Sequence, residues 1–329
     1  MRQDKDENQI YVNIEKIIDE CLLDYKTEPV DLRNIGHADN EDWYLSVFRH
    51  HYARTVHDIV CQFGKQASSI KVLEIGAFLG LVSIALSRIG FDVTAVDIPE
   101  YIANRNLQRK FNKHGIHYVE CNLRDYELPF DDEEFDVVIM CEVLEHLNFN
   151  PLPVIKEINR VLRPNGLMYL TLPNIASLGN RMKLLQGKSI HNPIKDFFLQ
   201  LDPNENIIVG LHWREYTTEE IKEMLEQMDF EVVKQRYENA PAQTDSIVSI
   251  KRIVITVLRC ILGVKPIRKV VSYCIKVVSY GIFDPDRDPS VKNTQVNFAL
   301  KKNKCLRQFH YTNATSPIKP DGIELKDDL

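Results

Sequence analysis

The apolar positions of this chain first repeat with a helical period and then gather into short, continuous runs. Residues 9–24 and 41–63 space their apolar side chains three and four positions apart, which predicts two amphipathic helices. Farther along, runs rich in β-branched residues alternate with helical segments. The runs span 70–75, 91–96, 116–121, 135–140 and 166–172. This alternation predicts parallel strands joined by right-handed crossover helices, and the scarcity of polar positions within the runs predicts helices on both faces of the sheet.

The C-terminal part of the chain follows a different pattern. Residues 173–213 are irregular, with several prolines and glycines. Thr217 and Glu220 have the spacing of a capping box, so a helix is expected to begin there. Runs at 230–236 and 294–300 are expected to add two strands, which makes seven in all.

Charge and composition predict three parts. They are an N-terminal helical cap over 1–66, a main domain over 67–302 and a loose polar tail over 303–329. Within the main domain, residues 247–283 carry seven basic residues, no acid and apolar side chains at helical spacing, which predicts a basic amphipathic helical insertion. Such helices can lie in an anionic membrane interface, while a dimer interface or a substrate lid is the alternative.

The overall composition excludes several classes of protein. With 41 Lys and Arg against 47 Asp and Glu, the net charge is −6, which argues against a general nucleic-acid binder. The 44% hydrophobic content is enough for a globular core. Seven scattered cysteines without a C-x-x-C pair, a polar N-terminus and the lack of a long uncharged apolar stretch predict a cytoplasmic protein. Membrane association is expected only through 247–283.

The segment VLEIGAFLG at 72–80 carries the most chemical information. Glu74 lies near the end of the first strand run, Gly76 follows where the chain must turn, and Gly80 lies where a helix begins. The second run ends at Asp97, a carboxylate suited to binding a ribose diol. Open α/β sheets bind ligands beyond the carboxyl ends of their strands, so we expect a binding crevice there.

Two nucleotide ligands compete for this crevice. A dinucleotide fingerprint needs glycines at 78 and 81, where this chain has Phe78 and Leu81. A pyrophosphate would also be repelled by Glu74, whereas the cationic amino-acid end and the sulfonium of S-adenosylmethionine would be attracted to it. The residues therefore favour S-adenosylmethionine as the cofactor over a nicotinamide.

Five segments in chain order resemble the motifs of the class I S-adenosylmethionine-dependent methyltransferases. They are VLEIGAFLG at 72–80, TAVDIP at 94–99, CNLRDYELPF at 121–130, FDVVIMCEVLEHL at 135–147 and LRPNGLMYLTLPN at 162–174. Phe78 takes the place of the usual middle glycine of the first motif. The resemblance covers about 70–236 and the closing strand, and implies an α/β, Rossmann-like, seven-stranded, mostly parallel sheet. It also implies cofactor-binding roles for Glu74, Gly76, Ala77, Phe78, Gly80, Asp97, Ile98, Asn122, Leu123, Cys141 and Glu142.

Two histidines are candidates for the base that a hydroxyl nucleophile would use. In CEVLEHL, Glu142, Glu145 and His146 have i, i+3, i+4 spacing and would share one face of a helix. Similar E-x-x-E-H segments occur in quinone-pathway O-methyltransferases, where metal dependence is known. These three residues could act as a base or orient the substrate, bind a metal ion, or serve only in packing. We expect no metal, because one short helix would supply every ligand.

The second histidine lies in GLHWREYT at 210–217. Besides His212, this segment offers Trp213, Arg214 and Tyr216 as substrate-binding residues, because aromatic rings stack on sugars and Arg binds phosphate or carboxylate. A packed surface corner is the alternative. The segment resembles that of methyltransferases encoded beside polysaccharide and glycolipid assembly genes. In the second predicted helix, His50, His51, Tyr52 and Arg54 would form either a lid over the cofactor or, as we favour, a solvated face.

The sequence therefore predicts a methyltransferase with His146, His212 and Glu145 as catalytic candidates. The first choice of reaction is O-methylation of a sugar hydroxyl in a glycan or lipid-linked saccharide. An O-methyltransferase of a quinone or other small aromatic, and a non-catalytic cofactor-binding subunit, are the alternatives. The expected partner is a small-molecule or glycan acceptor and not a nucleic acid, and the sequence leaves the oligomeric state open.

Overall fold

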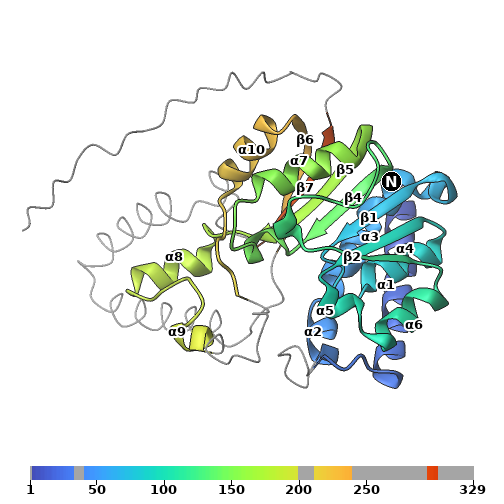
Figure 1. Ribbon diagram of the computed structural model, residues 1–329, viewed down its shortest axis with the longest axis horizontal. Coiled ribbons are helices and arrows are strands. Elements are labelled where there is room, and N and C mark those ends of the chain that lie inside the picture. The colour runs from blue at the N-terminus through green and yellow to red at the C-terminus, as the bar shows by residue number, and fades with distance from the viewer. Residues whose placement is uncertain (1, 33–40, 199–210, 239–294, 303–329) are drawn as a thin grey trace, which may run out of the picture.

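The computed structural model describes residues 2–32, 41–198, 211–238 and 295–302 (Figure 1). The predicted insertion at 247–283 and the predicted tail at 303–329 lie outside the described residues, so they stay predictions. None of the described helices has the length and apolar character needed to span a bilayer.

One mostly parallel sheet forms the centre of an α/β fold, as predicted. Its strand order is β3-β2-β1-β4-β5-β7-β6. The strands are β1 (Lys71–Ile75), β2 (Asp92–Asp97), β3 (His117–Glu120), β4 (Phe135–Cys141), β5 (Leu162–Pro173), β6 (Phe230–Glu238) and β7 (Gln295–Lys302). The first five are parallel neighbours, while β7 runs antiparallel between β5 and β6. The chain order reverses between β1 and β4, which is where such sheets form a ligand crevice.

Helices cover both faces of this sheet. One core contains residues of α1 (Arg2–Thr27), α3 (Arg49–Phe63), α4 (Leu81–Ile89) and α6 (Arg105–Lys113), and the other contains residues of α7 (Leu152–Val161) and α10 (Thr218–Gln227). Neighbouring strand residues enter opposite cores: Val72 belongs to the first and Leu73 to the second. A strand buried on both faces explains the continuous apolar runs of the sequence.

Two predicted helices are interrupted. The segment 41–63 forms α2 (Glu41–Val47) and α3, with a break at Phe48. The segment after β2 forms α5 (Pro99–Ile102) and α6, because the Asn104 side chain accepts hydrogen bonds from the backbone of Asn106 and Leu107 and so caps a new helix. Apolar periodicity continues through both breaks, so it could not reveal them.

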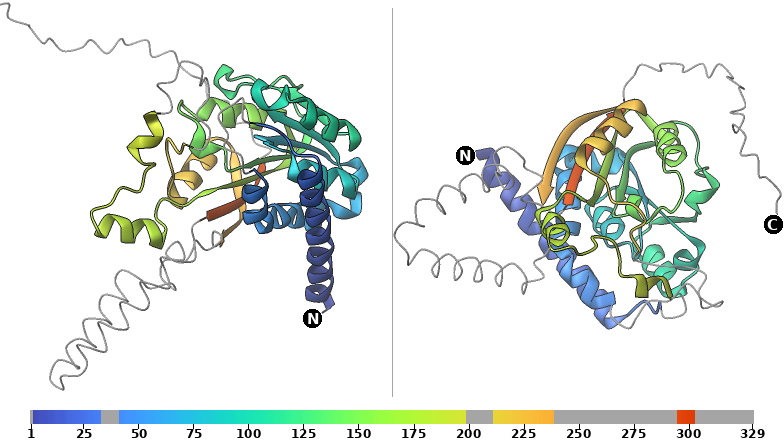
Figure 2. Two further views of the ribbon diagram at one scale, coloured as in Figure 1. Left: turned by 90° about the horizontal axis from the view of Figure 1, so that it is seen from below. Right: turned by 90° about the vertical axis from the view of Figure 1, so that its left-hand side faces the viewer.

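The C-terminal half contains the predicted capping box. The Thr217 side chain accepts from the Glu220 backbone, and the Glu220 carboxylate accepts from the Thr217 backbone at 2.8 Å, so α10 begins where the sequence predicts. Two short helices, α8 (Leu178–Leu185) and α9 (Ile194–Phe197), lie in the irregular segment and stand apart from the sheet (Figures 1 and 2).

A half-buried ionic group ties α3 to strands β5 and β6. Asp58 of α3 accepts hydrogen bonds from Tyr169 of β5, at 2.9 Å, and from Arg236 of β6. Burial alone would raise the pKa of Asp58, but the hydrogen bonds from His57, Arg236 and Tyr169 hold it well below its usual range. The network therefore stabilises the fold at neutral pH, and this contribution is lost as the pH falls through the lowered pKa.

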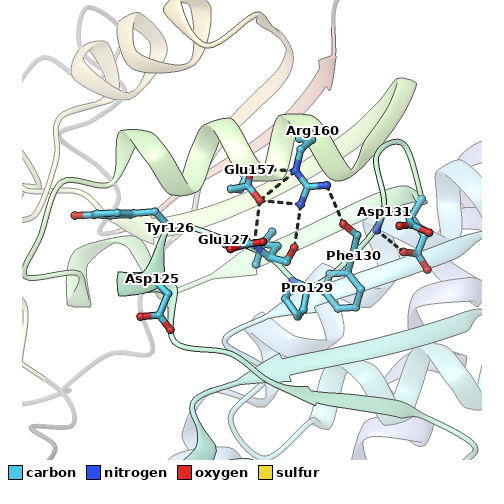
Figure 3. A pocket seen from close by; sticks show the side chains of 10 residues that line it. Asp125, Tyr126, Glu127, Pro129, Phe130, Asp131, Glu157 and Arg160 are labelled. Carbon is cyan, nitrogen blue, oxygen red and sulfur yellow. Dashed lines mark hydrogen bonds and ion pairs between the residues drawn. The ribbon is translucent and has the colours of Figure 1, made fainter.

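The acid-rich connection between β3 and β4 lies beside α7 and lines, with Glu157 and Arg160, an open pocket of about 740 Å3 (Figure 3). Arg160 of α7 donates to the backbone oxygens of Leu128 and Phe130 and to the carboxylates of Glu157 and Asp132. These hydrogen bonds, with that from Nε to Glu157, use all the N–H donors of Arg160. We therefore interpret this pocket as part of the loop's packing against α7 and not as a ligand site.

Candidate active site at the carboxyl ends of the strands

Two glycines shape the turn after β1. Gly76 has φ +70°, and a Cβ there would lie 2.3 Å from the Val143 side chain. Gly80, which precedes α4, has φ +71°, and a Cβ there would lie 2.1 Å from the Phe111 ring. Both positions therefore require glycine for its backbone conformation and for the lack of a side chain.

We expect Gly80→Ala to destabilise the protein by about 2 kcal/mol or more, because it adds left-handed strain and overpacks the core. Gly187→Ala is the matched control, since Gly187 has φ +69° and a methyl group added there would meet no atom within 4 Å. Chemical denaturation of both variants measures the difference, and equal destabilisation would show that the Phe111 contact is unimportant.

Phe78, which stands where the first motif usually has a glycine, adopts a left-handed backbone conformation. Its φ is +49°, and its backbone N–H donates to Asp97 Oδ2 at 2.6 Å. Its ring packs edge-on against Tyr44 of α2 and Tyr101 of α5, at centroid distances of 6.0 and 5.4 Å. These contacts offset the left-handed strain, which is about 1 kcal/mol. The turn thus keeps its shape without the middle glycine.

Two carboxyls lie beside this turn, with Glu74 buried and Asp97 half-buried. Glu74 accepts a hydrogen bond from the Ser83 hydroxyl of α4, and burial raises its pKa to about 7. Asp97 accepts from the backbone of Phe78 and, at 2.8 Å, of Ile98, and burial raises its pKa to about 6. The raised pKa values mean that both carboxyls hold a proton at a higher pH than usual. A ligand that brings a positive charge and hydroxyl donors would favour their ionised form, so such a ligand suits this site.

The raised pKa of Glu74 gives the site a predictable pH dependence. Between its ordinary pKa of 4.5 and about 7, the folded protein retains a proton that the unfolded chain has released, so the free energy of unfolding falls as the pH rises. Because a cationic ligand favours the ionised carboxyl, we expect its affinity to rise over the same interval. Glu74→Gln should flatten this rise in calorimetric titrations, and an unchanged slope would exclude Glu74 as its origin.

The remaining predicted cofactor residues line the same edge. The Ala77 backbone donates to Val96 at 3.1 Å, and the Cys121 backbone donates to Asp97 at 2.9 Å, which holds the ends of β1, β2 and β3 together. Asn122 is exposed and caps the short helix η3 (Leu123–Asp125), and Leu123 is half-buried. Cys141 ends β4 and is buried enough that the pKa of its thiol is raised. These placements are compatible with an adenine-binding role that stays a prediction.

The expectation that Glu142, Glu145 and His146 share one helix face is wrong. Glu142 has φ +54°, and only Leu144–His146 forms a short 3-10 turn, η4. Glu142 is held to β5 instead, because its N–H donates to the Thr171 carbonyl at 2.9 Å and its carboxylate accepts from the Thr171 hydroxyl at 2.8 Å. The left-handed residue turns the chain sharply after β4.

This turn brings the two candidate histidines together. The Glu145 carbonyl accepts hydrogen bonds from the backbone of Trp213 and Arg214, which docks the 211–217 segment on η4. The rings of His146 and His212 then meet edge to face at a centroid distance of 4.9 Å. The Nδ1 atom of His146 lies 2.9 Å from the Leu211 carbonyl, and desolvation lowers the pKa of this imidazole to about 4.

Glu145 lies beneath the histidine pair with no exposed surface. Both carboxyl oxygens lack a hydrogen-bond partner among the described residues, and burial raises the pKa of this carboxyl well above its usual range. Its Oε1 atom is 3.8 Å from Nε2 of His146. A buried polar group without a partner is costly, so this carboxyl is suited to a ligand that completes its hydrogen bonds.

Glu145, His146 and His212 offer ligand atoms that all lie within 4.8 Å of one another, an arrangement that could hold a metal ion. The sequence argument against a metal assumed that one short helix supplies every ligand. That premise is wrong, because His212 comes from a distant segment.

The three predicted substrate residues have different surroundings. Trp213 is exposed, and its ring packs edge-on against Phe197 of α9 at 5.7 Å. Arg214 lies over the Tyr216 ring and pairs with Glu220 at 2.8 Å, so its guanidinium is engaged by the start of α10. Tyr216 is buried. Trp213 therefore offers the exposed aromatic ring of the three, while the more exposed Arg214 is engaged by Glu220.

Sequence reasoning missed two residues near these strand ends. We favoured a solvated position for Tyr52, yet burial raises its pKa well above the usual value, and Tyr44, Glu74 and Glu142 raise it further. Tyr52 of α3 is half-buried and lies near Glu74 of β1 and Glu142 just after β4. Thr171 is the second, and its place at the end of a predicted strand was a signal that could have identified it.

A family model described as "Methyltransferase domain" matches residues 48–235, which is more than half of the chain. The chain belongs to this methyltransferase family. A methyltransferase family is what the sequence motifs predicted.

Several curated relatives carry the name ubiquinone biosynthesis O-methyltransferase. The protein from Rickettsia akari is 28% identical over 120 residues, which is 36% of this chain and 46% of that protein. The protein from Haemophilus ducreyi is 35% identical over 118 residues, 34% and 47% of the two chains. The mitochondrial protein from Rattus norvegicus is 33% identical over 131 residues, 39% and 37%. The match thus spans less than half the length of these relatives.

Among solved structures, an S-adenosylmethionine-dependent methyltransferase from Methanosarcina mazei is 18% identical. The alignment covers 74% of this chain and 97% of that one, with a TM-score of 0.46.

Proposed function

We propose that this protein methylates a hydroxyl group of a small aromatic acceptor of the quinone type. The observation that carries the proposal is the meeting of His146, His212 and Glu145 beyond the carboxyl end of β4, with the Glu145 carboxyl lacking a hydrogen-bond partner among the described residues. The names of the relatives support an aromatic acceptor over the sugar hydroxyl that the sequence analysis placed first. The exposed Trp213 ring supplies a surface on which a flat acceptor can stack.

Each residue of the site has a separate role in the proposed reaction. When bound, S-adenosylmethionine would supply an activated methyl group, with the sulfur as its leaving group. The turn around Gly76 and the carboxyl of Asp97 would hold the cofactor so that nucleophile and methyl are aligned. His212 takes the proton of the acceptor hydroxyl, and the oxygen electron pair forms the new O–CH3 bond. Glu145 donates or accepts a hydrogen bond at a second oxygen of the acceptor.

An acceptor panel tests this proposal. Purified protein is incubated with the methyl donor and either hydroxylated benzoates and hydroquinones or free and polymeric sugars, and methylated products are identified by mass spectrometry. We expect methylation among the phenolic acceptors. Methylation confined to the sugars would support the first choice of the sequence analysis, and cofactor binding with no transfer to either set would support a non-catalytic subunit.

A chelator experiment separates the two roles open to the histidine cluster. If His212 acts as the base without a metal, activity on the best phenolic acceptor should survive EDTA treatment. Activity that is lost with EDTA and restored by Mg2+ or Zn2+ would assign Glu145, His146 and His212 to a cation instead.

A further inference from the structure

The carboxylate of Glu215 contacts His212 through one oxygen and Asn180 through the other. Its Oε1 atom is 2.8 Å from Nδ1 of His212, and its Oε2 atom accepts from the side-chain amide of Asn180 at 3.3 Å. The Glu215 side chain is 16% exposed, compared with 33% for His212. Three side chains from two segments thus form one hydrogen-bonded row that ends at the imidazole.

Asn180 is itself fixed. Its side-chain amide also donates to the Ile175 carbonyl at 3.1 Å, and its backbone N–H donates to the Ser177 hydroxyl, which caps α8. Both amide protons of Asn180 are therefore committed, one of them to Glu215. Oε2 of Glu215 therefore accepts a hydrogen bond from Asn180. Oε1 of the same carboxylate is left as the acceptor that faces the ring nitrogen of His212.

The hydrogen-bond partners decide which nitrogen of His212 carries the proton. A carboxylate oxygen accepts hydrogen bonds, so Nδ1 must be the protonated nitrogen and Nε2 keeps the lone pair. The carboxylate also stabilises the imidazolium that forms when Nε2 gains a proton. His146 has the same protonated nitrogen, but its partner is the uncharged carbonyl of Leu211. Of these two histidines, His212 is therefore the one whose Nδ1 has a carboxylate partner to stabilise a positive charge.

We propose that Glu215 is a positioning residue that holds His212 in the Nδ1–H form, so that Nε2 receives the proton released by the acceptor hydroxyl. The proton-transfer part rests on the proposed function. The hydroxyl O–H bond breaks, its proton binds Nε2 of His212, and its electron pair stays with the oxygen that is methylated. Asn180 keeps Glu215 in line by donating to its far oxygen.

Glu215→Gln tests this inference, because a glutamine amide cannot accept at both positions. With Asn180 still donating to its oxygen, the amide NH2 would face Nδ1 of His212 and favour a proton on Nε2. Glu219→Gln is the matched control, since Glu219 is 84% exposed on α10 and pairs with Lys222. Long-range 1H–15N spectra of the histidine rings report the protonated nitrogen without any turnover, and steady-state kinetics report its consequence.

In the wild-type protein and Glu219→Gln we expect His212 to be protonated on Nδ1. In Glu215→Gln we expect the proton to move to Nε2, and kcat to fall at least about tenfold with KM and cofactor affinity nearly unchanged. A wild-type His212 with its proton on Nε2, or an unaltered ring in Glu215→Gln, would overturn the inference. Failure of the proposed function is distinguishable, because it would abolish turnover of the wild-type protein while leaving the ring spectra interpretable.

Discussion

Replacing His212 with alanine is expected to lower kcat about 100-fold or more at saturating cofactor, with little change in cofactor affinity. The reason is that Glu215 holds Nδ1 of His212 and leaves Nε2 to accept the proton, and general-base catalysis by a positioned side chain contributes about 100-fold to 10,000-fold. Single-turnover and steady-state assays on the best phenolic acceptor measure the loss.

Two variants accompany this experiment. His146→Ala should lose less activity, because desolvation keeps the His146 imidazole uncharged and its Nδ1 bonds to a backbone carbonyl. His117→Ala replaces an exposed histidine at the start of β3 and should leave kcat unchanged. If His146→Ala proves the more damaging substitution, the roles that we assign to the two histidines are reversed.

The second large effect is expected at Asp97. Asp97→Ala should weaken S-adenosylmethionine binding more than tenfold, because hydrogen bonds to a charged group contribute about 1.5–3 kcal/mol each. The substitution also removes the acceptor that holds the Phe78 backbone in its left-handed conformation. Isothermal titration calorimetry gives the affinity directly.

Asp92→Ala is the matched control for this prediction. Asp92 begins the same strand at its opposite, exposed end, so its loss should not alter cofactor binding. Equal affinities of the Asp97→Ala variant and the wild-type protein would remove Asp97 from the cofactor site.

The sequence predicted the parts of this fold that depend on local patterns. Strands buried on both faces produce continuous apolar runs, and the capping box at Thr217 and Glu220 is satisfied within four residues. The turn after β1 was also predictable, because Gly76 and Gly80 lie at fixed offsets from the strand end.

Features that depend on non-local contacts could not be predicted. The segment after β4 has a helical spacing of its polar residues, but the bonds between Glu142 and Thr171 of another strand override it. The meeting of His146 with His212 depends on backbone hydrogen bonds between η4 and a segment more than sixty residues away. Glu215 gave no signal of its own, because an acid after an arginine in an irregular segment is ordinarily a solvated side chain.

The most direct test is a crystal structure of the protein with S-adenosylhomocysteine. We predict the ribose hydroxyls at Asp97, the amino-acid end beside the turn at Gly76, and the sulfur facing the pair formed by His146 and His212. An adenosyl ligand bound elsewhere, or a crevice that stays empty at saturating ligand, would contradict the account.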